Sequence, residues 1–132
     1  MALEIGDDLD LKDIEKFKRN LVRANLIRAD LQGMDLSGAN MVGARLMGAY
    51  MMTTNLMGAH LCNANLMGAN LWGAKLRRAD LRGAILEGTN LREADLSGVT
   101  NLTLCQIRKA KTDKRTCLPE SLLEEENLAG KA

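Results

Sequence analysis

Four aspartates recur at one position of a five-residue pattern, and a positioned carboxylate can act as a general acid or base. They are Asp30, Asp35, Asp80 and Asp95. Short polar side chains beside a turn also bond the neighbouring backbone, and Asn or Asp fills this position in eleven of sixteen repeats. We therefore interpret the four aspartates as turn-stabilising residues and expect no catalytic carboxylate.

His60 and Cys62 flank one leucine, and imidazole and thiolate are both good metal ligands. A metal site needs further ligands, and no second pair occurs at a matching spacing. A single histidine also makes a Ser/His/Asp set implausible, and no glycine-rich phosphate loop fits the sequence. The sequence therefore predicts no metal, no cofactor, no small-molecule substrate and no enzymatic activity.

Cys105 and Cys117 lie twelve residues apart, and a turn between them could bring the two thiols together. Three sparse cysteines suit a reducing compartment better than a disulfide framework. We expect both side chains to be small apolar fillers, and a disulfide between them is the alternative.

A five-residue repeat must position all of these side chains. Its central residue recurs at 21, 26, 31 and onward to 96 without insertion, as fourteen leucines together with Met41 and Met51. The residue two positions earlier is Ala in twelve repeats, and ten of the twelve glycines follow the central residue by two. On an α-helix each step of five turns the side chain by about 140°, and on a flat strand odd spacing alternates the faces. The chain must therefore bend once in every repeat.

The bend places Ala and Leu inside and the residue between them outside, since alternate residues of an extended segment share one face. The glycines then occupy the second central position of a type II turn, which requires a positive φ. Six repeats have another residue there: Arg23, Arg28, Thr53, Asn63, Arg78 and Glu93. For these corners we predict a negative φ, with Asn63 as the one residue that tolerates the left-handed region.

Residues from about 19 to 98 resemble the pentapeptide-repeat proteins, whose motif A-(N/D)-L-x-x is seen in "ANLMG" at 64–68 and "ADLRG" at 79–83. The resemblance implies an all-β solenoid, a right-handed parallel quadrilateral β-helix with four repeats in each coil. Sixteen repeats imply about four coils. Some members of the family are DNA mimics that bind type II topoisomerases, which is the alternative function that the resemblance offers.

Both ends of a solenoid need caps, because each exposes a leucine layer and unpaired backbone groups. We expect an N-terminal cap over residues 1–18, the β-helix over 19–98, and a C-terminal helical cap and tail over 99–132. In the first cap, Asp10 precedes a short helix whose apolar side chains are Leu11, Ile14 and Phe17, with Phe17 over the open leucine layer. In the second, Thr103 and Gln106 have capping-box spacing and predict a helix from Leu104 to about Lys111.

The charge balance argues against a protein that binds nucleic acid through a strong field, since 18 basic residues face 17 acidic ones. Basic residues gather in the last two predicted coils, but acidic residues are interspersed and favour a solvated mixed surface. The N-terminus has neither the charge nor the apolar run of a signal peptide, and no membrane span is predicted. We expect a cytoplasmic protein.

Apolar residues occupy an outward position, directly after the central leucine, in the first three predicted coils. Residues twenty apart should stack, so that Ile27, Met47 and Met67 form one line and Met52 lies beneath Trp72 in the next. A contiguous apolar patch with Met and Trp is typical of a contact surface. The sequence thus predicts a non-catalytic scaffold that binds a protein partner or a second copy of itself. The expected binding residues are Trp72, Met52, Met47, Met67, Met57, Ile27 and Val42.

Overall fold

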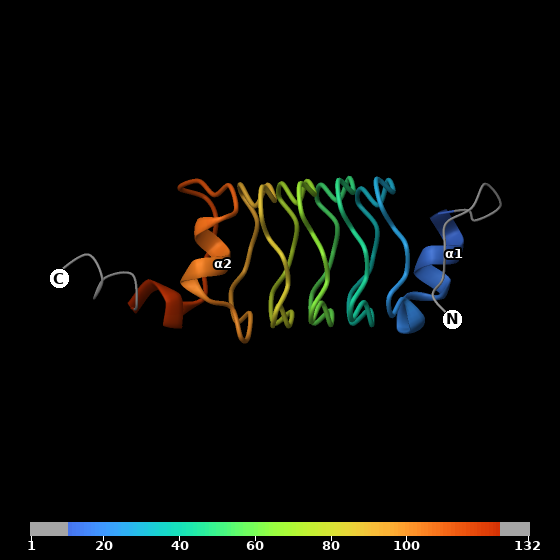
Figure 1. Ribbon diagram of the computed structural model, residues 1–132, viewed down its shortest axis with the longest axis horizontal. Coiled ribbons are helices and arrows are strands. Elements are labelled where there is room, and N and C mark those ends of the chain that lie inside the picture. The colour runs from blue at the N-terminus through green and yellow to red at the C-terminus, as the bar shows by residue number, and fades with distance from the viewer. Residues whose placement is uncertain (1–10, 125–132) are drawn as a thin grey trace.

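Backbone pairing repeats every twenty residues. The computed structural model describes residues 11–124, and its chain forms fourteen parallel bridges between neighbouring turns. In twelve of them the partners are twenty residues apart, from Asn25 with Arg45 to Asp80 with Thr100. Four pentapeptides therefore complete one turn, and the turns stack along the long axis of the molecule (Figure 1). Each repeat contributes one bridging residue, so the walls are very short extended segments separated by turns.

The central leucines and methionines fill the interior of the coils. All sixteen are at most 2% exposed, Met41 and Met51 included, as the repeat predicts. Most residues two positions before them are buried alanines. Thr54 and Thr89 replace alanine there without leaving a polar atom unpaired, because each hydroxyl donates a hydrogen bond of 2.7 Å to a backbone carbonyl of the preceding coil.

The N-terminal end is covered by helix α1 (Leu11–Lys16), which leads into the short 3-10 helix η1 (Lys18–Asn20). Ile14 is 1% exposed and belongs to the core, whereas Phe17 is 44% exposed. The predicted position of Phe17 over the leucine layer is therefore wrong. The chain turns into η1 at Phe17, and the ring lies beneath the Lys16 ammonium at 5.5 Å instead. Asp10 and the side chain of Leu11 lie outside the described residues.

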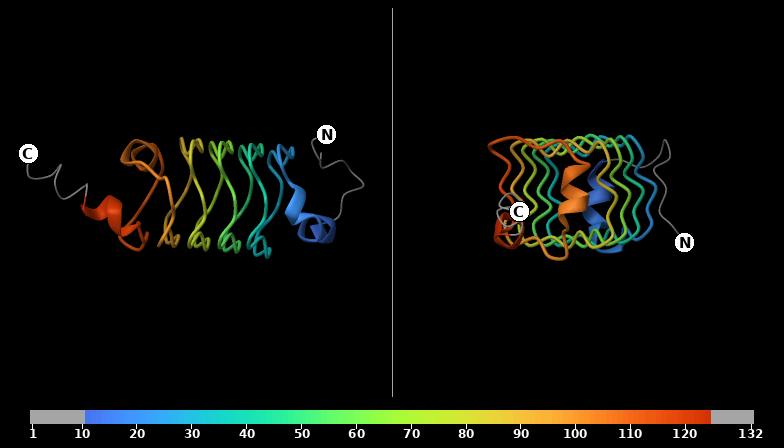
Figure 2. Two further views of the ribbon diagram at one scale, coloured as in Figure 1. Left: turned by 90° about the horizontal axis from the view of Figure 1, so that it is seen from below. Right: turned by 60° about the vertical axis from the view of Figure 1, so that its left-hand side comes forward.

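The C-terminal end is crossed by helix α2 (Leu104–Arg108), which Figure 2 shows in front of the coils. The predicted capping box is confirmed, since Thr103 and Gln106 each bond the other's backbone amide. The helix ends at Arg108 rather than near Lys111, because the chain returns to the ladder and the Lys109 carbonyl accepts from the Gly88 amide at 2.9 Å. Residues 120–124 form a further helical turn. Cys105 and Cys117 are exposed free thiols, so the expectation that both are apolar fillers is wrong.

All sixteen corners have a positive φ. The ten glycines have φ between 65° and 70°, and the six other residues have φ between 55° and 61°. The predicted negative φ at non-glycine corners is therefore wrong. The corner amide must donate to the next coil, as Arg23 does to the Val42 carbonyl at 2.8 Å and Gly43 to the Cys62 carbonyl at 2.8 Å. The ladder thus imposes one turn geometry on every residue type.

Glycine lies directly above five of the six non-glycine corners. A Cβ built at Gly43 would approach Arg23 Cγ to 3.3 Å, and one at Gly98 would approach Arg78 Cγ to 3.4 Å. A Cβ at Gly83 would collide with the Asn63 side chain. A side chain in the left-handed conformation therefore leans over the next coil, and the glycine above leaves room for it.

Replacing Ile14 with alanine should lower the free energy of unfolding by about 2–4 kcal/mol, since it empties a buried site in the first layer. Replacing Phe17 with alanine should cost less than about 1 kcal/mol, because that ring is largely in solvent. Urea denaturation of the two variants measures both values. A larger loss for F17A than for I14A would contradict this assignment of the N-terminal cap.

Replacing Gly83 with alanine should destabilise the protein more than replacing Gly58. Both variants place a Cβ in the left-handed region, at a cost of about 1–2 kcal/mol, but nothing lies within 4 Å of a Cβ at Gly58. The collision with Asn63 should add about 1 kcal/mol to G83A. Denaturation of G58A, G83A and N63G/G83A tests this, and the extra loss should vanish in the double variant. Equal losses in G58A and G83A would show that the corners do not interact.

Candidate protein-interaction surface

Asparagine and aspartate side chains fix the outward residues of the corners. Ten of them accept a hydrogen bond from the backbone amide two residues later, at 3.0–3.4 Å. The set includes Asp30, Asp35, Asp80 and Asp95, which confirms the structural role predicted for the four aspartates. The same bond holds the backbone of Trp72, whose amide donates to Asn70 Oδ1 at 3.1 Å.

These bonds lower the pKa of two of the aspartates, Asp35 and Asp80. The Ser37 hydroxyl and amide, with Lys18 nearby, hold the pKa of Asp35 below its ordinary value of 3.8. The Arg82 amide and the Cys62 thiol similarly lower the pKa of Asp80. A general base should have a pKa near the operating pH, so carboxylates shifted in this direction are poor candidates for that role.

His60 and Cys62 are the two candidate metal ligands that flank Leu61 in the sequence. No group of three or more His, Cys, Asp or Glu residues that could hold a metal ion occurs among residues 11–124. Burial and the adjacent Asp80 carboxylate raise the pKa of the Cys62 thiol. The thiol therefore stays protonated at neutral pH, and a thiol is a weaker nucleophile and metal ligand than a thiolate.

The outward apolar residues stack in columns, because each is tied to the coil before it. The Met52 carbonyl accepts from the Gly33 amide at 3.0 Å, and the Trp72 carbonyl accepts from the Thr53 amide at 2.9 Å, one coil later. In the neighbouring column, Met47 and Met67 accept in the same way from Arg28 and Gly48. Outward residues that are twenty positions apart in the sequence therefore lie at the same corner of successive coils.

Five of the predicted binding residues border a single wall. This wall, here named the Tyr50 face, is centred on the bridged residues Asp30, Tyr50, Asn70 and Asn90. Met47 and Met67 precede it at one corner, and Met52 and Trp72 follow it at the next, with Ile27 at the N-terminal end of the first column. Val42 lies one corner earlier and Met57 one corner later, so neither borders this wall. We name Met47, Met52, Met67 and Trp72 the Met/Trp surface.

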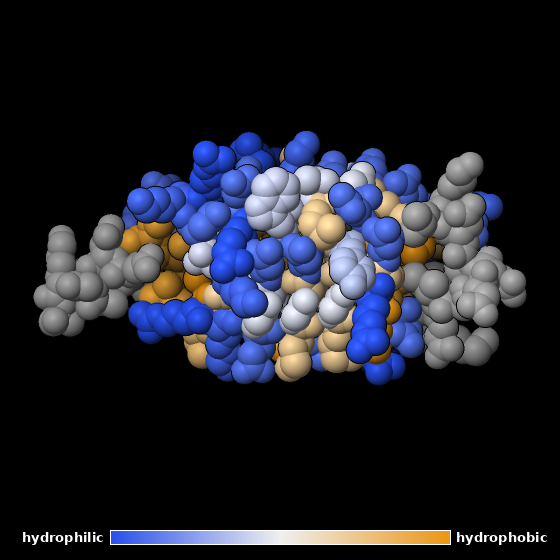
Figure 3. Space-filling view, turned by 90° about the horizontal axis from the view of Figure 1, so that it is seen from above, coloured by the Kyte–Doolittle hydropathy of each residue, from blue (hydrophilic) through white to orange (hydrophobic). Residues whose placement is uncertain are grey.

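The Met/Trp surface is open to solvent but is not uniformly apolar. Trp72 is 41% and Met67 42% exposed, whereas Met47 and Met52 are half-buried. Figure 3 shows apolar residues in separate groups among polar ones on the side of the molecule that it presents. Along the middle of the Tyr50 face the side chains of Asn70 and Asn90 bond each other at 3.1 Å. Two apolar columns thus flank a partly polar line.

Tyr50 is an exposed aromatic residue that sequence reasoning missed as a binding residue. It is 51% exposed and stands between Met47 and Met52 along the chain. It occupies the position that usually holds the turn-stabilising Asn or Asp. We therefore treated it as a residue with a structural role. The signal that could have found it is an aromatic side chain at a position where other repeats are polar.

A family model described as pentapeptide repeats matches the chain in eight copies, over residues 20–58, 53–83 and 74–111. This chain belongs to the pentapeptide-repeat family. Members of the family are right-handed β-helices, and the parallel bridges found here fit that architecture. A comparison of this pentapeptide-repeat protein with curated protein sequences found no match.

Solved pentapeptide-repeat structures resemble this chain over part of their length. Rfr23 from the cyanobacterium Cyanothece 51142 is 40% identical with a TM-score of 0.67, and the match covers 72% of this chain and 64% of that protein. HetL from Nostoc sp. strain PCC 7120, a protein involved in heterocyst differentiation regulation, is 31% identical with a TM-score of 0.52. That match covers 70% of this chain and 52% of HetL. This chain therefore spans less than two thirds of either protein.

QnrB1, a plasmid-mediated fluoroquinolone resistance protein, is 20% identical, with a TM-score of 0.30 over 81% of this chain and 71% of QnrB1. This similarity is too low to support an inference about the present pentapeptide-repeat protein.

Acid should destabilise this protein through its turn aspartates. Because the pKa values of Asp35 and Asp80 are lowered in the folded state, the stability they contribute is present above pH 3.8 and is lost as the pH falls through the lower folded values. In the double variant D35N/D80N the amide oxygens still accept from the turn amides but no longer titrate. Its free energy of unfolding should therefore fall less steeply below about pH 4 than that of the wild type. Urea denaturation between pH 2 and 7 measures this. An equally steep loss of the free energy of unfolding below pH 4 in the variant and the wild type would contradict it.

Proposed function

We propose that this pentapeptide-repeat protein is a non-catalytic scaffold for protein–protein interaction, which binds a partner protein or a second copy of itself through the Met/Trp surface. The observation that carries the proposal is the exposure of Trp72, Met67 and Tyr50 on one wall of a coil whose inward residues are fully buried. Large apolar and aromatic side chains in solvent lower the free energy of a complex when a partner covers them.

The backbone under this surface supports the proposal. Each residue of the two columns is held by ladder hydrogen bonds of 2.9–3.0 Å, and the amides of Trp72 and Met67 are also held by Asn side chains. A surface that is already ordered loses little conformational entropy when it binds. Methionine side chains remain adaptable, which lets the surface fit a partner of irregular shape.

Further parts of the proposal follow from the sequence. We propose a right-handed β-helix of four coils over residues 19–98, capped at both ends by residues 1–18 and 99–132, in a cytoplasmic protein without cofactor. Pentapeptide-repeat proteins are generally non-catalytic, and the turn role of the aspartates agrees with this. No helix in the described part of the chain is long and apolar enough to cross a membrane.

The alternative, a DNA mimic that modulates a type II topoisomerase, needs a strongly acidic surface. The repeat region instead holds more basic than acidic residues, which makes it the weaker proposal. A gyrase supercoiling assay in the presence of a fluoroquinolone, with and without this protein, discriminates the two. If the protein protected gyrase from the drug, the topoisomerase proposal would replace the scaffold proposal.

The double variant W72D/M52D should abolish assembly or partner binding. Charges at the two positions leave apolar groups of the partner against desolvated carboxylates, so affinity should fall by at least about thirtyfold, as for loss of a hot spot. Light scattering and sedimentation of the purified chain measure self-association, and affinity capture from the native organism measures partner binding.

The matched control is F17D, which places the same charge on a ring 44% exposed at the N-terminal end. This control should assemble and bind as the wild type does, and both variants should retain the wild-type unfolding midpoint within a small margin. Unchanged assembly and capture in W72D/M52D would remove the proposed role of the Met/Trp surface.

A further inference from the structure

Apolar side chains on the Tyr50 face are concentrated in its two middle coils. The four residues of the Met/Trp surface lie in the second and third coils, two at the corner before this wall and two at the corner after it. Tyr50 adds an exposed aromatic ring at the centre of the second coil. In the first and fourth coils of this face the one apolar outward residue is Ile27, which is half-buried. The exposed apolar area is therefore symmetrical about a line between the second and third coils.

The two ends of the same face carry charges of opposite sign. At the corner before the wall, Arg28 lies in the first coil and Glu87 in the fourth, so this column is positive at its N-terminal end and negative at its C-terminal end. Along the centre of the wall the order is reversed. Asp30 lies in the first coil, and Lys111 bridges Asn90 beyond the fourth. The four charged side chains are all exposed.

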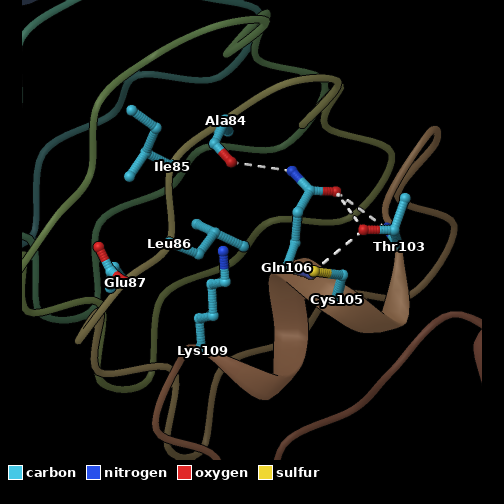
Figure 4. Close-up of a pocket in the computed structure, with 8 residues that line it drawn as sticks. All are labelled: Ala84, Ile85, Leu86, Glu87, Thr103, Cys105, Gln106 and Lys109. Atoms are coloured by element: carbon cyan, nitrogen blue, oxygen red, sulfur yellow. Dashed lines mark hydrogen bonds between the residues drawn. The ribbon is translucent and has the colours of Figure 1, made fainter.

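These four charges have no ionic partner in the part of the chain that the structure describes. The ion pairs found there involve none of them. Glu87 and Lys109 line one pocket beside α2, but no ion pair joins the two side chains (Figure 4). The charges at both ends of the Tyr50 face are therefore available to another molecule.

We propose that the partner is a second copy of this chain and that two Tyr50 faces pack together with their coils antiparallel. This inference rests on the proposed function of the Met/Trp surface. A two-fold axis in the plane of the interface, placed between the second and third coils, brings Met47 of one copy onto Met67 of the other. It also brings Met52 onto Trp72. Each contact occurs twice, as in any interface of this symmetry.

The same axis pairs the charges at the two ends. Arg28 of one copy lies opposite Glu87 of the second copy, since the first coil meets the fourth. Asp30 lies opposite Asn90 of the second copy and next to the ends of Lys111 and Arg92. A surface whose apolar area is symmetrical about the axis and whose charges change sign across it is complementary to itself.

A polar contact at the centre of the face fits this arrangement. The axis places Tyr50 opposite Asn70 of the second copy. Asn70 Oδ1 already accepts from the Trp72 amide and from Asn90 Nδ2, both at 3.1 Å. Its Nδ2 donates to no group among the described residues, so it is free to donate to the Tyr50 hydroxyl. The partly polar line between the two apolar columns thus gains a hydrogen bond on each side of the axis.

Parallel packing of the two copies is disfavoured by the same charges. A two-fold axis along the solenoid would place each coil opposite the same coil of the second copy. Glu87 would then meet Arg92, but Asp30 would lie against Asp30 of the second copy, and Arg28 would have no acid opposite. Antiparallel packing brings only opposite charges together at both ends.

The small size of the face predicts a weak dimer. It spans four coils, or about 19 Å at ~4.8 Å for each coil. An interface of this extent belongs to the class below about 1,200 Å², which is typical of weak and transient complexes. The dimer should therefore depend on concentration and, through its charged ends, on ionic strength.

Reversing the charges at the two ends tests both the partner and the register. Either R28E or E87R alone converts two contacts of opposite charge into contacts of like charge, so the Kd of the dimer should rise about tenfold at low ionic strength. The double variant R28E/E87R restores opposite charges only when the copies are antiparallel. Its Kd should return to within about twofold of the wild-type value. Sedimentation equilibrium from about 10 µM to about 1 mM measures the four values.

The matched control is R23E. Arg23 has the equivalent corner position one repeat earlier, with a φ of 55° against 58° for Arg28, and its corner does not border the Tyr50 face. Glu93 shows that glutamate is accepted at such a corner, at a φ of 58°. The R23E variant should dimerise as the wild type does, and all variants should keep the wild-type unfolding midpoint within a small margin.

Two outcomes would overturn the inference. One is a wild-type chain that stays monomeric at about 1 mM, and the other is a double variant as weak as the single ones. Capture of a different protein that is lost in W72D/M52D, with a monomeric wild type, would sustain the scaffold proposal while overturning this one. A dimer that W72D/M52D leaves unchanged would overturn both.

Discussion

The hydrogen-bond register between coils is the constraint on which the rest of the structure depends. Each repeat donates two amides to the coil above and receives one from it, at a spacing of twenty residues. A net gain of about 1 kcal/mol for each of these bonds, together with a buried leucine worth about 1.5–3 kcal/mol, exceeds the cost of about 1–2 kcal/mol for a left-handed non-glycine residue. This is why Arg28, Thr53 and Glu93 have the same corner conformation as glycine.

The same register separates the positions that make the fold from those that can carry function. Inward positions accept Leu, Met, Ala or a hydroxyl-bonded Thr and little else, because they fill a narrow core. Outward positions are free to vary, provided that the turn amide is satisfied or open to water. Repeats that depart from Asn or Asp at the outward centre, as at Tyr50 and Ile85, have exchanged a turn-stabilising bond for exposed apolar surface. The departure at Tyr50 lies on the wall at which we propose contact with a partner.

The sequence was sufficient for what the five-residue period determines, namely the bend in each repeat, the burial of Leu and Ala, and the role of the aspartates. It was also sufficient for the capping box at Thr103, which depends only on local spacing. It failed where a distant contact overrides a local preference. The φ of Arg23 is decided by a carbonyl of the next coil, and local propensity predicted the opposite sign. Phe17 was misplaced because the path of the chain after α1, rather than its apolar spacing, decides which residue covers the core. The bonds from Gln106 to the carbonyls of Leu81 and Ala84 could not be foreseen, since they depend on how α2 crosses the last coil.

The direction of the ladder also explains why the C-terminal end favours acceptors. Each repeat of the last coil presents two amides and one carbonyl toward that end, so donors outnumber acceptors there. The chain meets most of them with acceptors of its own: the carbonyls of Lys111 and Cys117 accept from Leu91 and Leu96, and Asp113 Oδ1 accepts from the Glu93 amide at 3.1 Å. The side-chain amide of Gln106 donates to two carbonyls, those of Leu81 and Ala84. No group in the described residues accepts from the Leu86 amide.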